Sequence, residues 1–170
     1  MDKFKIETER LLLREIDLED IKNFNILGSN KNITKHLDYI KTNSKAETEK
    51  WIQQRIEWNK QIPKTSLNLT ITLKDTSEFV GWIGIGEAEN LENGEMDFGY
   101  AILPKFQRKG FASETLKAVI EYCFKNMKVT KIFGDCDKNN IASRNVMEKV
   151  GLKFEKEESE KVYLSISKNS

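Results

Sequence analysis

Residues 96–127 constrain the fold most, because they combine a strand, a short basic turn and an amphipathic helix. The strand is expected at 96–103, where Pro104 ends it, and the turn at 107–112 has the sequence Gln-Arg-Lys-Gly-Phe-Ala. The following helix carries apolar side chains at helical spacing, at Leu116, Val119, Ile120, Cys123, Phe124 and Met127. The first amides of a helix have no intrahelical acceptor, and a glycine lets the backbone approach a phosphate closely. This order therefore predicts a pyrophosphate site at the start of the helix.

Two common phosphate-binding motifs do not fit this turn. No Gly-Lys-Ser/Thr ending follows a glycine-rich run, which excludes a P-loop. A dinucleotide fingerprint needs three glycines near a first strand, whereas this turn has one glycine, at position 110. Lys105, Arg108 and Lys109 add positive charge beside it. Taken alone, the turn also fits a basic, solvated start of a helix.

The residues before this segment predict a first strand and two helices. The strand is expected at 6–15, and Asp17 is a suitable N-cap for a short helix. Ser44 and Glu47 form a capping-box pattern in front of a longer helix. We expect four side chains of that helix in the core or in the wall of a groove: Trp51, Ile52, Ile56 and Trp58.

A three-stranded meander is predicted next. Strict alternation at 67–73 indicates a half-buried strand, and a polar turn separates it from a second strand at 79–86. The second strand is expected to place its large side chains on two faces, one with Val80 and Trp82 and the other with Ile83 and Ile85. Asn93-Gly94 is a hairpin signal before the third strand.

The end of the chain completes an α/β pattern. The remaining elements are expected at 130–136 for a strand, at 142–150 for a helix that Gly151 ends, and at 152–155 and 161–167 for closing strands. The Lys- and Glu-rich residues 155–161 are expected to form a charged hairpin turn. The order predicts a mixed, mainly antiparallel sheet with helices on both sides, in which the strands around the crossover helix run parallel.

The turn Gln107-Arg108-Lys109-Gly110-Phe111-Ala112 resembles the acetyl-coenzyme A signature of the GNAT N-acetyltransferases, Gln/Arg-x-x-Gly-x-Gly/Ala. Three further segments are similar to this family in the same order along the chain, namely 8–14, 97–100 and 140–152. The first of them, Thr-Glu-Arg-Leu-Leu-Leu-Arg, resembles the opening strand of the RimJ/RimL-type branch, which acetylates protein N-termini and other amines. The resemblance covers most of the chain.

This resemblance implies a single GNAT domain over residues 6–167 with a β-α-β core that binds acetyl-CoA as cosubstrate. In that fold the two strands of the core splay apart, and the pantetheine arm of the cofactor lies between them. A backbone amide near Ile102 is implied as the donor to the carbonyl oxygen of the acetyl group. The cofactor-binding residues implied are Ile102, Leu103, Gln107, Arg108, Lys109, Gly110, Phe111, Ala112, Asn140 and Ser143.

The resemblance also implies two catalytic side chains. Asp97 lies where the family usually carries a glutamate that acts as base, although a structural or solvent-facing acid fits equally well, and Glu95 is a poorer candidate. Ser143 matches the RimL-type serine that donates to the leaving sulfur. Asn140 either binds the pantetheine amide or caps the helix. Many GNATs carry a tyrosine acid farther along this helix, where this chain has Val-Met at 146–147.

The acceptor is expected to be a primary amine, either a protein N-terminus or a small molecule. Its walls are expected from residues 25–62 and from the closing hairpin. That hairpin is shorter than in RimJ/RimL-type chains, which argues against ribosomal-protein specificity, and Glu157, Glu158 and Glu160 match no family acid. A monomer or a homodimer is expected. An alternative function is a regulatory domain that binds CoA without turnover.

Composition excludes several other classes. The 28 basic and 27 acidic residues balance to a net charge of +1, so no nucleic-acid partner is expected, and 38% hydrophobic residues suffice for a core. Cys123 is expected in the core, and Cys136 has no evident histidine partner for nucleophilic catalysis. His36 is expected at the surface or in packing, so no metal is expected. Neither a signal peptide nor a membrane span is evident, and a cytoplasmic location is expected.

Overall fold

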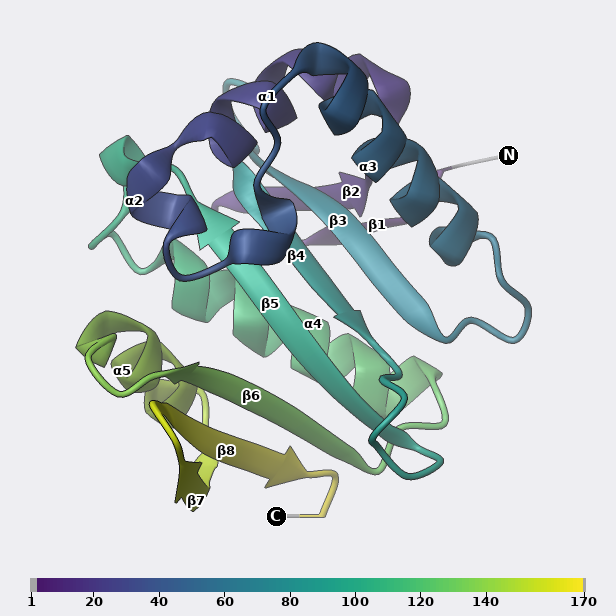
Figure 1. Ribbon diagram of the computed structural model, residues 1–170. Coiled ribbons are helices and arrows are strands. Elements are labelled where there is room, and N and C mark those ends of the chain that lie inside the picture. Colours follow the sequence, from purple (N-terminus) through teal and green to yellow (C-terminus); the bar gives the residue numbers. More distant parts are fainter. Residues whose placement is uncertain (1–2, 170) are drawn as a thin grey trace.

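A computed structural model describes residues 3–169, and within them eight strands form one sheet (Figure 1). The strands are β1 (Lys5–Glu7), β2 (Leu11–Glu15), β3 (Ser66–Leu73), β4 (Phe79–Gly86), β5 (Glu95–Ile102), β6 (Lys131–Asp137), β7 (Lys153–Glu158) and β8 (Lys161–Ser167). Their order in the sheet is β1-β2-β3-β4-β5-β6-β8-β7. Only β5 and β6 pair in parallel among these strands, which confirms the mixed, mainly antiparallel sheet. Met1 and Asp2, at the start of the segment that lacks signal-peptide features, lie outside the described residues.

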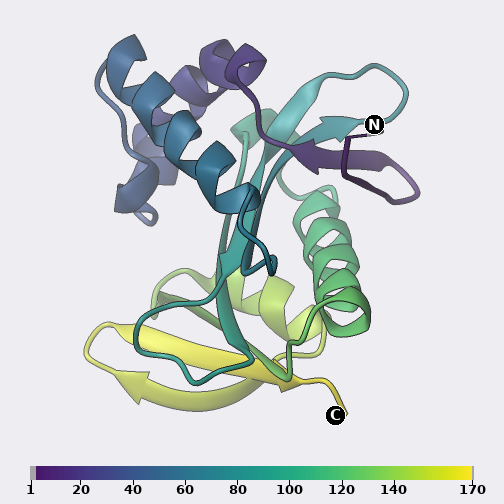
Figure 2. The same cartoon turned by 90° about the vertical axis from the view of Figure 1, so that its right-hand side faces the viewer.

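Helices cover both faces of this sheet. The helices are α1 (Ile21–Ser29), α2 (Lys31–Thr34), α3 (Lys45–Asn59), α4 (Phe111–Asn126) and α5 (Ile141–Lys149), with short 3-10 turns η1 (Leu18–Asp20), η2 (Asp38–Ile40) and η3 (Pro104–Phe106). Figure 2 shows α1 to α3 on one side of the sheet and α4 on the other. Helix α5 contacts α4 and β6.

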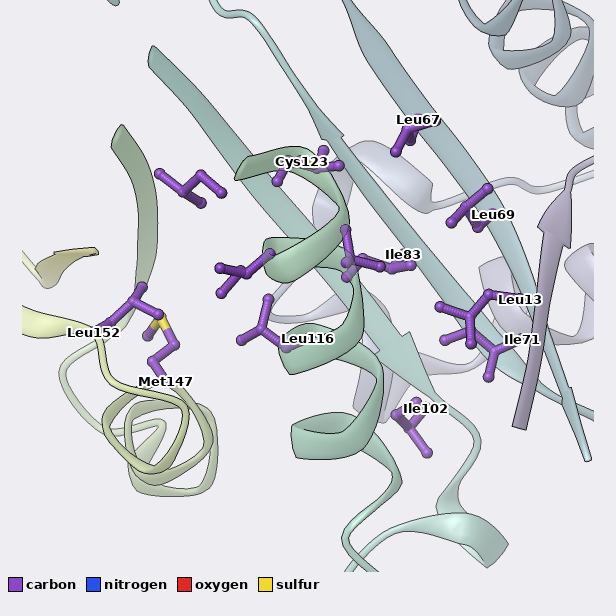
Figure 3. Packing of buried hydrophobic residues seen from close by; sticks show 14 of the residues in the cluster. Leu13, Leu67, Leu69, Ile71, Ile83, Ile102, Leu116, Cys123, Met147 and Leu152 are labelled. Atoms are coloured by element: carbon purple, nitrogen blue, oxygen red, sulfur yellow. The ribbon is translucent and has the colours of Figure 1, made fainter. Parts of the chain in front are cut away.

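Two clusters of buried side chains hold the layers together. The larger cluster packs α4 and α5 against the sheet, and Figure 3 shows Leu116 and Cys123 of α4 between the strands and the side chains of Met147 and Leu152. The smaller cluster, which includes Ile52 and Trp82, lies under α1 and α3. Each fully buried Leu, Ile or Met side chain contributes about 1.5–3 kcal/mol relative to an exposed one. The burial of Leu116 and Cys123 in the larger cluster confirms the expected apolar face of α4.

Strands β5 and β6 separate soon after they meet. Their parallel pairing covers only Glu95–Asp97 opposite Lys131–Phe133. Beyond that point β6 continues to pair with β8, and β5 continues to pair with β4. The two strands diverge toward α5, as Figure 1 shows. The implied splay is confirmed, and it leaves one edge of β5 without a partner strand where the ligand is expected.

Two predicted element boundaries are wrong. Residues 6–15 do not form one strand, because the chain reverses at 8–10 and β1 pairs back on β2, with the Thr8 amide donating to the Leu11 carbonyl at 3.0 Å. Residues 155–161 are not a turn, because β7 extends to Glu158 and pairs with β8. Its charged side chains are all exposed and form pairs such as Lys156–Glu158 at 2.6 Å, so an edge strand accommodates them.

The predicted faces of β4 are also partly wrong. Thr72 pairs with Phe79 and Ile71 with Gly81, so Val80 is the extra residue of a β-bulge. The bulge shifts the alternation by one residue. Val80 consequently joins Ile83 and Ile85 in the larger cluster, while Trp82 packs in the smaller cluster.

Most of the predicted caps and turns are present. Asp17 caps η1 and forms a full capping box with Asp20. Ser44 accepts the Glu47 amide, but the Glu47 carboxylate accepts from the Asn43 amide at 2.7 Å, so only half of the expected capping box forms. The turn at 93–94 is present at the end of a longer loop, 87–94, and Gly151 follows α5 with a φ of 104°.

Candidate active site

The turn before α4 forms an open cradle of backbone amides. Gly110 has a φ of 82°, a conformation that side chains disfavour, and it directly precedes the first helical residue. Among the described residues, nothing accepts a hydrogen bond from the amides of residues 110–113. Gln107 donates from Nε2 to the Ile102 carbonyl at 2.9 Å, which ties the turn to the end of β5. The cradle has the free amides and the positive helix end that an anion requires.

The three basic residues in and just before the turn, Lys105, Arg108 and Lys109, have different surroundings. Lys105 forms an ion pair with Glu78, so its charge is already compensated. The Lys109 ammonium lies 5.9 Å from the Phe106 ring, and Lys109 does not line the cavity described below. Arg108 does line it, with a φ of 60° that sequence reasoning did not anticipate. In the part of the chain that the structure describes, Lys105 therefore differs from the other two basic residues in having a carboxylate partner.

A clasp that the sequence did not reveal holds the cradle in place. Glu114, in the first turn of α4, accepts hydrogen bonds from the Thr8 hydroxyl at 2.6 Å and the Arg10 amide at 2.9 Å. The Arg10 side chain also pairs with Glu114 at 2.7 Å and lies over the Phe111 ring at 4.3 Å. Although partial burial opposes it, the hydrogen bonds from Thr8 and Arg10 lower the pKa of Glu114. The β1–β2 turn thus fixes the start of α4.

The cradle opens into a cavity of about 840 Å³, named here the donor cavity. Its walls come from α2, the end of β5, the start of α4, and α5. Five of the residues expected to bind the cofactor line it, namely Ile102, Gln107, Gly110, Phe111 and Ala112, whereas Leu103 packs between the two core clusters. The volume lies in the range of known ligand sites.

Asn140 and Ser143 reach the donor cavity from α5. Asn140 caps this helix, because its Oδ1 accepts the Ser143 amide at 3.2 Å. The Tyr100 hydroxyl donates to Ser143 Oγ at 3.2 Å across the splay. Burial raises the pKa of Tyr100, and the bond to Ser143 partly opposes that shift. Sequence reasoning missed this role of Tyr100, although the residue belongs to the strand motif at 97–100.

A second cavity of about 670 Å³, named here the acceptor cavity, lies under α3. It is lined from α3 and from strands β3, β4 and β5. The acceptor and donor cavities share four lining residues: Tyr39, Phe98, Gly99 and Asp135. The two cavities therefore meet at the splay between β5 and β6.

Asp97 lines the acceptor cavity beside this meeting point. Its carboxyl is exposed to the cavity, yet the surrounding walls remove water and raise its pKa above the ordinary value of 3.8. The negative charge of Asp135 raises the pKa of Asp97 further. Asp135 itself pairs with Lys161 at 2.7 Å. A carboxylate of raised pKa in a cleft is suited to accept a proton from an amine.

Tyr39 lies over the sheet where the donor and acceptor cavities meet. A Cβ atom on Gly99 would lie 1.7 Å from the Tyr39 hydroxyl, so only glycine allows this close approach. The Tyr39 carbonyl accepts from Trp51 Nε1 at 2.9 Å, which fixes η2 to α3. Sequence reasoning missed Tyr39, because nothing near it in the chain forms a motif.

The orientation of the Ile102 amide follows from the sheet register. The Leu103 amide donates to the Val80 carbonyl of β4 at 2.9 Å. Successive residues of an antiparallel strand point their amides to opposite sides. The amide of Ile102 is consequently directed away from β4, toward the splay. This is the direction that a donor to the acetyl carbonyl oxygen requires.

The cysteines and the histidine behave as expected. Burial raises the pKa of Cys123 to about 12, so its thiol stays protonated in the core. Burial also raises the pKa of Cys136, which lines the donor cavity. His36 Nδ1 lies 2.9 Å from Asp137 at the wall of that cavity. Among residues 3–169, no three His, Cys, Asp or Glu side chains gather to hold a metal ion, and every helix is too short or too polar to cross a bilayer.

The family model described as the acetyltransferase (GNAT) domain matches residues 10–153. The chain belongs to the GNAT family. This GNAT N-acetyltransferase is 29% identical over 153 residues to the uncharacterized N-acetyltransferase YnaD of Bacillus subtilis, with 88% of this chain and 83% of YnaD covered. The family model spans the donor cradle, every residue that lines the acceptor cavity, and α5, so the resemblance seen in the sequence motifs is confirmed.

Solved structures share this GNAT fold. The ribosomal L7/L12 α-N-protein acetyltransferase RimL, solved in complex with coenzyme A, superposes with a TM-score of 0.85 at 20% identity, covering 96% of this chain and 98% of RimL. The spermidine N-acetyltransferase of Vibrio cholerae, solved with CoA and spermine, gives a TM-score of 0.81 at 20% identity, covering 95% and 98%. These likenesses establish the fold, and they include a protein acetyltransferase and a polyamine acetyltransferase alike.

Proposed function

We propose that this protein transfers the acetyl group of acetyl-CoA to a primary amine by direct attack, and that residues 6–167 act as one domain. One observation carries the proposal: the donor cavity with its amide cradle and the acceptor cavity with Asp97 meet at Phe98 and Gly99 on β5. An acyl donor and an amine placed in these two cavities come together at the splay. Positioning of this kind supplies a large part of the acceleration in transfer reactions.

The cradle fits the pyrophosphate of CoA. The free amides of residues 110–113 and the positive end of α4 face the same cavity as the Arg108 side chain. The left-handed backbone of Gly110 leaves no side chain between these amides and a phosphate. The pantetheine arm would then follow the open edge of β5, where the amide of Ile102 points. Asn140 contributes by holding Ser143 in place.

Asp97 serves as the base for the amine in this proposal. The ammonium of the acceptor gives its proton to Asp97, directly or through one water, because aspartate is one methylene shorter than the family's usual glutamate. The amine nitrogen then bonds to the acetyl carbon while the carbon–sulfur bond breaks, and the nitrogen gives its second proton to water as the amide forms. The Ile102 amide donates to the carbonyl oxygen as negative charge develops on it.

Ser143 supplies the proton for the leaving sulfur. Its oxygen already accepts a hydrogen bond from Tyr100, so its own hydrogen is free to point into the donor cavity. The CoA thiolate takes this proton, and water or the Tyr100 hydroxyl returns it. The tyrosine that many GNATs carry on α5 is thereby replaced by a serine on α5 and a tyrosine on β5.

Calorimetry with acetyl-CoA tests the cradle through Gly110→Asp. A carboxylate among the phosphate-binding amides is expected to weaken binding by about 100-fold or more, because opposing like charges costs several kcal/mol. Gly110→Asn is the matched control, since it has the size of aspartate and shares the backbone strain without the charge, and it should bind more tightly than the Asp variant. Equal affinity of the Asp variant and the wild type would refute the cradle. Tight binding without thiol release over a panel of amines would favour a regulatory domain.

A further inference from the structure

The acceptor cavity contains a buried cation that has no carboxylate partner. Arg55 of α3 is only 7% exposed, and its guanidinium stacks on Trp51 at 3.8 Å and on Trp58 at 4.7 Å. Its Nη1 donates to the Trp51 carbonyl and to Gln54, which are both neutral. Arg55 forms no ion pair with any described residue. An uncompensated buried charge is strongly unfavourable, so this arginine is poised for an anion.

Other donors without partners lie in the same cavity. Four buried side-chain polar atoms of the described residues lack a hydrogen-bond partner, and three of them belong to residues that line the acceptor cavity: Arg55 Nε, Trp82 Nε1 and Ser66 Oγ. Folded proteins satisfy nearly all buried polar groups. Three of the four unsatisfied groups thus belong to the walls of one cavity, which favours a polar over an apolar ligand there.

Arg55 and Trp82 lie toward one end of this cavity, and Asp97 lies toward the other, in the row of Ser66 and Gly86. Trp51 contacts both Arg55 and the ring of Trp82, with a Trp51–Trp82 centroid distance of 5.4 Å. The Trp82 ring lies against Gly84, two residues along β4 from Gly86, which pairs with Asp97. Two residues of a strand span about 7 Å. The edge of the Trp82 ring therefore lies about this far along the sheet from the row of Asp97, a separation that a small molecule with a charged group at each end can span.

Tyr39 marks the boundary between the two ends. Burial is the main cause of the raised pKa of Tyr39. The negative charges of Asp135 and Asp97 raise this pKa further, whereas the positive charge of Arg55 lowers it. The Tyr39 hydroxyl is therefore within electrostatic reach of both the acids and the arginine. Ser66 pairs with Gly86 and so lies in the row of Asp97, where its hydroxyl is suited to accept from an ammonium.

We propose that the acceptor is a small amino carboxylate, whose carboxylate binds Arg55 and Trp82 while its amine lies beside Asp97 and Ser66. The inference rests on the proposed function, because it assigns the substrate of the same site. The cavity of about 670 Å³ suits a small molecule. A peptide N-terminus carries an amide in place of the free carboxylate, and a polyamine would bring a second cation toward Arg55.

Thiol release measured with matched acceptors tests this assignment. The panel pairs free α-, β- and γ-amino acids with their carboxamides, and adds spermidine and an N-terminal peptide. The best carboxylate is expected to exceed its carboxamide by about 10- to 100-fold in kcat/KM, the range that a charge-assisted hydrogen bond provides.

Arg55→Met then removes the charge while keeping the length that packs between the two tryptophans. It should lower kcat/KM for the carboxylate by about 10- to 100-fold and leave the carboxamide unchanged. Arg55→Lys should retain part of the preference. Lys60→Met removes an exposed charge just after the same helix, outside the cavity, and should change neither value. Acetyl-CoA binding and thermal unfolding of each variant show that it is folded.

The outcomes separate the two proposals. If wild-type protein binds acetyl-CoA and acetylates carboxamides, peptide or spermidine as fast as amino carboxylates, the assignment of Arg55 is wrong and the proposed function stands. The assignment is also wrong if acetyl-CoA binds and no amino carboxylate reacts. If acetyl-CoA does not bind at all, the proposed function itself fails. The wild-type panel decides these cases even if Arg55→Met does not fold.

Discussion

At the scale of single residues, the raised pKa of Asp97 depends on its burial and on a neighbouring charge rather than on its residue type alone. The walls of the acceptor cavity and the negative charge of Asp135 both disfavour its ionised form. A group that must take a proton from an ammonium benefits from such a shift, because a higher pKa makes it a stronger base. Asp135, which is paired with Lys161, thus belongs to the tuning of the site although no motif includes it.

Replacement of Asp135 by Asn is expected to move the acidic limb of the pH profile. In the proposed mechanism Asp97 acts in its ionised form, so kcat/KM should be lost as pH falls through its raised pKa. Asp135→Asn removes a like charge, which lowers the pKa of Asp97 and shifts the limb to lower pH. The measurement is kcat/KM against pH for both proteins.

Two control variants test whether the acidic limb reports Asp97 and whether the shift is specific to Asp135. Asp97→Asn should lower kcat/KM by about 100-fold or more across the range, as loss of a general base does. Asp137→Asn removes a charge two residues away that pairs with His36, and the limb should stay in place. If Asp135→Asn does not move the acidic limb of the kcat/KM profile, that limb reports the ionisation of a group other than Asp97.

At the scale of elements, α5 depends on a single cap to present Ser143. Asn140 accepts the Ser143 amide, so the residue that starts the helix also fixes the catalytic candidate three residues later. The helix has nine residues and buries only Met147 completely, so tertiary packing holds it at few points. The cap is therefore a large part of what positions Ser143.

Variants of Asn140 distinguish a cap from a ligand of pantetheine. Serine is as good an N-cap as asparagine, so Asn140→Ser should keep stability, while Asn140→Ala should lose about 1 kcal/mol. If Asn140 acts only as a cap, both stability by urea unfolding and CoA affinity follow this order. A Ser variant with wild-type stability but much weaker CoA binding would show instead that the amide contacts the cofactor.

At the scale of the whole molecule, two clusters lie on opposite faces of one sheet. All three tryptophans are near α3, two on the helix itself and Trp82 on β4, whereas Leu116 is buried under α4 on the other face. The strands contribute to both clusters, and Leu103 packs against each of them. Loss of packing on one face should therefore destabilise the other.

Leu116→Ala tests this coupling, because the side chain is fully buried. It should cost about 2–5 kcal/mol, the usual range for a leucine deleted from a core. The urea midpoints measured by tryptophan fluorescence and by far-UV circular dichroism should fall by the same amount, since residues 6–167 are proposed to unfold as one domain. A fluorescence transition that stays at its wild-type midpoint would show two independent units.

The sequence by itself determined those features that depend on residues close in the chain. Helical spacing in α4, the cap at Asp17, the glycine of the cradle and the stop at Gly151 are all patterns within a few positions, and they are present as predicted. The element order then predicted the mixed sheet and the parallel pair β5 and β6. These features together predicted where the amide cradle and the splay between β5 and β6 lie.

The tertiary structure alone decided which residues join Asp97 in the acceptor cavity. Arg55, Tyr39 and Asp135 lie far apart in the chain, and only the packing of α3 and η2 on the sheet brings them to one cavity. The same holds for Tyr100 with Ser143, 43 positions apart, and for Thr8 with Glu114, 106 positions apart. The bulge at Val80 likewise arises from the pairing of two strands. Spacing encodes neighbours along an element, whereas contacts between elements depend on how buried surfaces fit together.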